Sequence, residues 1–155
     1  MRRTTPTPVI ALFVIGLAIG FLAEISAAAS GLPVFVAPLS LPITLVAVAA
    51  GVLALAWPIR KATNGPSRPV NPFVAMRVAV LAKSASLSGS LLFGAGTGIL
   101  LYLLTRAVMP ATQSLWLTVV AALGGAVLLI AGLIAEFFCT LPPDDHEHEP
   151  GGEHV

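Results

Sequence analysis

The sequence predicts an all-α integral membrane protein, a four-helix bundle with both termini in the cytoplasm. Of its 155 residues, 57% are hydrophobic and 10% are charged, whereas soluble domains average about 25% charged residues. The apolar residues form four long runs, each close to the roughly 17–25 residues that a helix needs to cross the hydrocarbon core. The segments between the runs are too short to bury a core of their own, which predicts one transmembrane domain over residues 1–141.

The first helix is expected over residues 9–29. Gly16 and Gly20 have the small-xxx-small spacing that allows close helix contact in lipid, and Glu24 continues the same stripe. A basic start, an apolar run and a small-residue end also describe a secretory signal peptide. Because the run exceeds the roughly 7–15 apolar residues typical of a signal peptide, we expect the segment to be retained as a helix. Cleavage is the alternative.

Three further helices are expected over residues 41–58, 73–104 and 113–139. Trp57-Pro58 favours the end of the second helix, and Asn71-Pro72 suits an N-cap followed by a first-turn proline at the start of the third. The apolar loop 30–39 is expected to lie along the outer interface, with a re-entrant loop as the alternative. The acidic tail 142–155, which contains His, is expected to be disordered and cytoplasmic, with weak metal binding as the alternative.

Basic residues predict the orientation, because Lys and Arg gather on the cytoplasmic side of membrane proteins. If the four helices alternate in direction, the basic residues at the N-terminus and in or beside the second predicted loop fall on the side that holds both termini, whereas Arg106 falls on the other side. The sequence therefore predicts a multi-pass protein of the cell inner (plasma) membrane, surrounded by membrane lipids. The group consists of Arg2, Arg3, Arg60, Lys61, Arg68 and Arg77.

Four charged residues are the candidates for an intramembrane polar or ion-pair role, because charges within a membrane are costly and often functional: Glu24, Lys83, Arg106 and Glu136. We hypothesise an inner ion pair between Lys83 and Glu136 and an outer one between Glu24 and Arg106, each fixing how helices meet. One alternative is that each side chain extends separately to its nearest interface. The other is a proton or ion pathway.

The third and fourth helices each carry a stripe of small or hydroxylated residues at helical spacing. Such stripes favour close packing with hydroxyl groups bonding across the contact, which predicts that these two helices form the central pair. The alternative is a narrow polar path for a solute. The stripe residues are Ser86, Ser90, Gly94 and Gly98 on the third helix, and Gly125 and Gly132 on the fourth.

Motifs for chemistry are missing from the sequence. It has no phosphate-binding loop, dinucleotide fingerprint, HExxH or nucleophile elbow, and no basic segment with interleaved aromatics that would suggest nucleic-acid binding. We therefore expect no catalysis, cofactor or metal site. The predicted role is an accessory, scaffold or assembly partner that binds another membrane protein or its own copies. A small transporter or channel subunit, using the polar face of the third helix, is the alternative.

Five segments carry a resemblance to a known family: GLPV at 31–34, PLSL at 38–41, AWPIR at 56–60, NPF at 71–73 through RVAVLAKSA at 77–85, and CTLPPDD at 139–145. They resemble a DUF3180-like domain of unknown function, found in an uncharacterised family of small actinobacterial membrane proteins. That family has no established activity or catalytic residues. The resemblance implies a four-helix membrane protein and adds no site chemistry.

Overall fold

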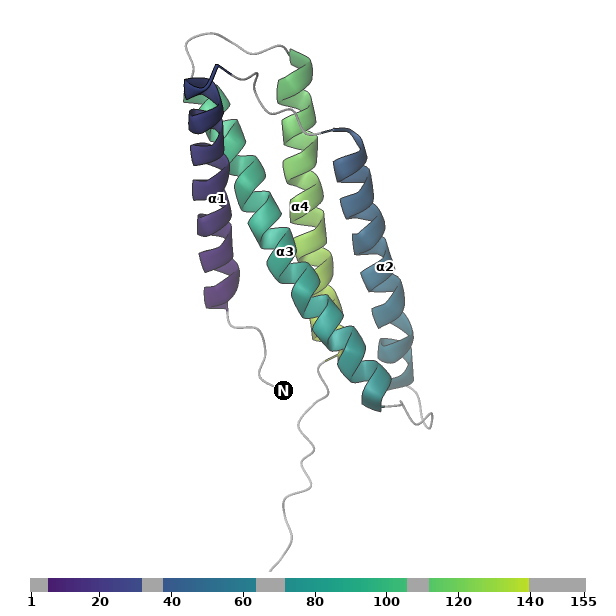
Figure 1. Cartoon of the computed structure of the whole chain (residues 1–155). Coiled ribbons are helices and arrows are strands. Elements are labelled where there is room, and N and C mark those ends of the chain that lie inside the picture. Colours follow the sequence, from purple (N-terminus) through teal and green to yellow (C-terminus); the bar gives the residue numbers. More distant parts are fainter. Residues whose placement is uncertain (1–5, 32–37, 64–71, 106–111, 140–155) are drawn as a thin grey trace, which may run out of the picture.

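The computed structural model describes residues 6–31, 38–63, 72–105 and 112–139 (Figure 1). These segments form four helices: α1 (Pro6–Ala29), α2 (Ser40–Thr63), α3 (Pro72–Thr105) and α4 (Thr112–Cys139). Each of the four is long and apolar enough to cross a membrane. The structure thus confirms the predicted all-helical fold class with four candidate spans. The predicted tail and Arg106 lie outside the described residues.

Local sequence signals explain most of the helix ends. Pro6 lies in the first turn of α1, where no intrahelical N–H bond is lost. After α1, Gly31 adopts a φ of 69°, a left-handed conformation that favours glycine, and its N–H donates to the carbonyl of Ala28 at 3.2 Å. In contrast, α2 continues past its predicted end at Pro58 to Thr63. Proline inside a membrane helix removes one backbone bond, and neighbouring turns can tolerate that loss.

The helices are arranged in the order α1, α3, α4, α2 rather than in a closed ring (Figure 1). Helix α3 packs against α1 on one side and α4 on the other, whereas α2 packs mainly on α4. Among the described residues, α1 contacts neither α2 nor α4. The starts of α1 and α3 and the ends of α2 and α4 lie at one end of the bundle (Figure 1). We call this the basic end, because it carries Arg60, Lys61, Arg77 and Lys83.

Small side chains fill the interior, and large apolar side chains cover the outside. Ile10, Val46, Leu81 and Ile130, one from each helix, are all exposed. Lipid tails are as apolar as leucine, so exposing these side chains to a bilayer has little cost, and small residues allow closer helix contact. The main cluster joins α2, α3 and α4 through Ala49, Val52, Ala56, Ile59, Val78, Ala82, Ala85, Leu128, Ala131 and Ala135.

Candidate functional site

Helices α1 and α3 meet through four glycines. Gly16 and Gly20 on α1 lie against the backbone of α3, and Gly94 and Gly98 on α3 lie against the backbone of α1. A Cβ atom added at any of the four would collide with a backbone carbonyl group of the partner helix. Residue numbers rise together along the two helices: Gly94 meets Phe13 and Leu17, and Gly98 meets Leu17 and Phe21. Helices α1 and α3 therefore run parallel. These contacts leave no room for a larger side chain.

Helices α3 and α4 also approach at backbone distance. A Cβ added at Gly132 would lie 2.5 Å from the Ser86 nitrogen, and one added at Gly125 would lie 2.7 Å from the Phe93 nitrogen. Residue numbers rise along α3 as they fall along α4, so the pair is antiparallel. The stripe predicted on α3 is therefore divided between two neighbours, since Gly94 and Gly98 face α1 while Ser86 faces α4.

Two further glycines of this contact were missed by the sequence reasoning. Gly89 lies against Leu129, and Gly96 lies against Ala122. Gly89 and Gly96 are seven residues apart, as are Gly125 and Gly132 on the facing helix. A shared seven-residue spacing is typical of helices that pack along a common seam, and this signal could have found them.

The serine hydroxyls of α3 bond within their own helix. Ser86 and Ser90 are both 0% exposed. The Ser86 Oγ donates to the carbonyl of Lys83 at 2.9 Å, and the Ser90 Oγ donates to the carbonyl of Leu87 at 2.7 Å. The sequence predicted that these hydroxyls would bond across the helix contact, whereas both bond within α3. The reason is that a carbonyl one turn back is always within reach of a helical serine. The two serines are therefore buried because their side chains are small, and not because they bond to another helix.

Ser90 allows a direct test of this interpretation. Ser90→Ala should change the free energy of unfolding by less than about 1 kcal/mol, because the lost bond is local to α3. Ser90→Leu should lower it by about 1–3 kcal/mol, because the added volume has no space. Denaturant unfolding in mixed micelles, followed by circular dichroism, measures both. A loss in Ser90→Ala as large as that in Ser90→Leu would mean that the hydroxyl itself holds the contact.

Residues of three helices mark a boundary at the basic end. The Arg60 guanidinium on α2 lies over the Phe138 ring on α4, 4.2 Å from its centre. One turn back on both helices, Trp57 is level with Ala135. The contact of Ser86 with Gly132 places Lys83, three residues before Ser86, at the level of Ala135 as well. Lys83 is therefore level with an exposed tryptophan, the kind of residue that favours a membrane interface.

A matching level lies at the opposite end of the bundle. Glu24 is 2% exposed, and extending the glycine register by about one turn beyond Gly20 and Gly98 places it level with Tyr102. The Phe21 and Tyr102 rings meet edge to face with centres 5.9 Å apart, in agreement with this register. The α3–α4 register places Trp116 at the same level. Because Arg106 lies outside the described residues, the hypothesised pair between Glu24 and Arg106 stays a prediction.

The two levels are separated by one membrane thickness. Lys83 and Tyr102 are nineteen residues apart on α3, a rise of about 28 Å. The hydrocarbon core of a bilayer is about 30 Å thick. In a bilayer crossed by these four helices, Glu24 and Lys83 would therefore lie near the two boundaries rather than at mid-depth, the arrangement expected for side chains that reach an interface.

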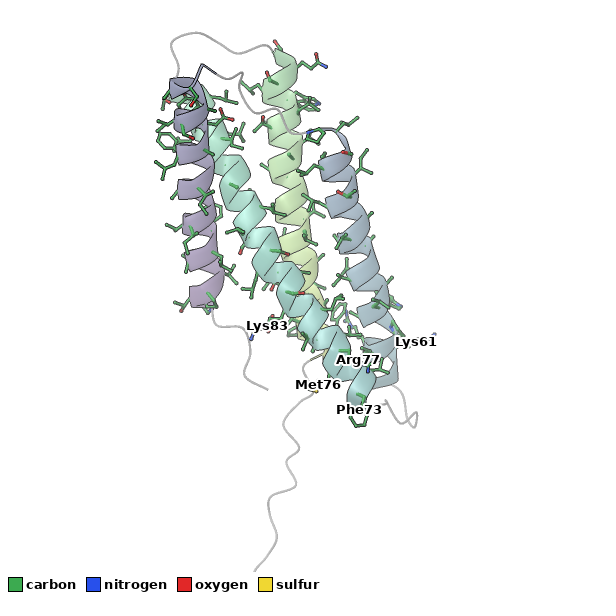
Figure 2. All side chains as sticks on the ribbon, viewed as in Figure 1. Lys61, Phe73, Met76, Arg77 and Lys83 are labelled. Carbon is green, nitrogen blue, oxygen red and sulfur yellow. The ribbon has the colours of Figure 1, made fainter. Side chains whose placement is uncertain are left out.

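Lys83 and Glu136 both belong to the part of the chain that the structure describes, and they do not form the hypothesised ion pair there. Lys83 is exposed and extends from α3 beneath the start of α1 (Figure 2). Glu136 is half-buried on α4, with its Oε2 atom shielded from solvent. In the same part of the chain, no group of three or more His, Cys, Asp or Glu side chains could hold a metal ion.

Comparison with known proteins adds a family. Residues 9–143 match the family described as protein of unknown function, DUF3180. The chain belongs to this family. The DUF3180 match spans every glycine and serine contact described above, together with both membrane levels, and the family description assigns no activity. Neither the curated proteins nor the solved structures contain a match to this DUF3180 chain.

Proposed function

We propose that this DUF3180 protein is a non-catalytic accessory, scaffold or assembly partner of a larger system in the plasma membrane. The main support is that its best candidate for a polar path, the Ser86 and Ser90 face of α3, is fully buried by helix packing. A solute path needs polar groups accessible near mid-membrane. The serine hydroxyls are instead engaged by carbonyls of their own helix.

The open arrangement of the helices supports association with other membrane proteins. Among the described residues, helix α1 packs against α3 alone, and α2 packs mainly against α4. The remaining sides of both helices carry exposed apolar residues, including Ile15 and Ile19 on α1 and Val48 and Leu55 on α2. These sides are available either to lipid or to the helices of a partner.

The charge distribution supports a cytoplasmic location for the basic end. The four described cations, Arg60, Lys61, Arg77 and Lys83, all belong to that end, and Glu24 is the one described charge at the other. Lys and Arg accumulate on the cytoplasmic side of membrane proteins. Both the start of α1 and the end of α4 would then face the cytoplasm.

A pull-down of the tagged, natively expressed protein in mild detergent tests the proposed role. We expect a second membrane protein to copurify at comparable abundance, identified by mass spectrometry and absent from an untagged strain. A complex containing this chain alone would contradict the heteromeric role and favour the transporter alternative. Transport would then be tested with Lys83 and Ser90 variants in reconstituted vesicles.

A further inference from the structure

Lys83 differs from the other cations of the basic end in its depth. It is level with Trp57, whereas Arg60 lies about one turn closer to the aqueous side and rests over the Phe138 ring. Extending the α1–α3 register back from Gly16 and Gly94 places the start of α1 level with Ser84. Lys83 lies next to that level, and its exposed side chain extends from α3 below the start of α1 in the view of Figure 2.

The protein supplies no counter-ion to Lys83 among its described residues. Glu136 is the one described acidic residue at the basic end, and it is half-buried on α4 without an ion pair to Lys83. A lysine at the hydrocarbon boundary lays its apolar stem along the membrane and extends its ammonium group to the head-group layer. The anion available in that layer is the phosphate of a phospholipid.

We propose that exposed Lys83 binds the head-group phosphate of an anionic phospholipid, at the level where α1 begins. Apolar side chains around Lys83 favour a lipid over a free phosphate ion. Val80, about one turn toward the aqueous side, is 59% exposed, and Leu87, about one turn toward mid-membrane, is half-buried. The ammonium would hold the head group while Leu87 and the lower part of α1 contact the acyl chains.

Native mass spectrometry of the purified full-length chain tests this site. The protein is titrated in detergent with phosphatidylglycerol or with phosphatidylcholine of the same acyl chains, and the bound lipids are counted. We expect preferential retention of phosphatidylglycerol. Lys83→Gln should weaken its binding roughly fivefold, the effect expected from one cation near an anionic surface. Lys83→Arg should retain binding. The matched control Lys61→Gln removes an exposed cation from α2 and should have a smaller effect.

Three results would overturn the proposal: equal retention of the two lipids, unchanged phosphatidylglycerol binding in Lys83→Gln, or a loss in Lys61→Gln as large as that in Lys83→Gln. Inorganic phosphate serves as a separate arm. If it displaces phosphatidylglycerol from the wild type at equal concentration, the site recognises free phosphate rather than a lipid. Lys83→Met provides a second variant of similar volume, and circular dichroism in lipid-free detergent verifies that each variant is folded.

Discussion

Replacing Gly94 with leucine should separate α1 from α3 and lower the free energy of unfolding by about 3 kcal/mol, the upper part of the range for overpacking. The reason is that a Cβ atom at Gly94 would collide with the backbone of Phe13 and Leu17. Backbone atoms cannot rotate aside as a flexible side chain can. Denaturant unfolding in mixed micelles, followed by circular dichroism, measures the loss.

Gly51→Leu is the matched control for this prediction. Gly51 lies within α2, and a Cβ atom added there would meet nothing within 4 Å. Leucine also has a higher helix propensity than glycine, so this variant should be as stable as the wild type or slightly more stable. Equal losses in Gly94→Leu and Gly51→Leu would show that the α1–α3 glycine contact does not stabilise the bundle.

Glu24→Lys should severely reduce the amount of folded protein in the membrane. Glu24 is 2% exposed in the contact between α1 and α3, one turn beyond Gly20. A lysine there would be longer than the glutamate and would bury the opposite charge at this position. Reversing a buried charge in this way should cost at least the roughly 3–5 kcal/mol of breaking a buried ion pair. The amount of a fluorescent fusion in isolated membranes, together with its size-exclusion profile, measures the outcome.

Two further variants test whether the loss comes from burying a positive charge or simply from adding one to α1. Ser26→Lys introduces the same charge on the same helix at an exposed position and should accumulate nearly as the wild type does. Glu24→Gln keeps the shape of the side chain and should accumulate better than Glu24→Lys. If Ser26→Lys were depleted as strongly as Glu24→Lys, the effect would come from charge at this end of the membrane rather than from the buried position.

Hydrophobic run length was enough to predict four helices, because a membrane span must satisfy its backbone within one helix and present apolar side chains over its whole length. Both requirements concern residues of a single helix, so they can be recognised directly from the sequence. Small residues at helical spacing also drew attention to Gly16, Gly20, Gly94 and Gly98. The end of α2 was predicted less well, since Pro58 is an interruption that membrane helices tolerate.

Pairing between helices was much harder to predict. The stripe on α3 suggested one packing face, whereas Gly94 faces α1 and Ser86 faces α4. The inner charges suggested an ion pair, whereas Lys83 extends beneath α1 and Glu136 is half-buried on α4. A stripe of small residues predicts that another helix packs closely against it, but the stripe does not identify which helix.

Hydropathy and residue patterns along the chain were enough to predict the fold class, the four candidate spans and the family. The folded arrangement was needed to find the open order α1, α3, α4, α2, the parallel and antiparallel registers, and the levels of Glu24 and Lys83 relative to the aromatic residues. The physical reason is that spanning a membrane depends on hydropathy summed along one helix. Neighbour choice depends instead on which backbones can approach at glycine, and this contact is made between residues far apart in the chain.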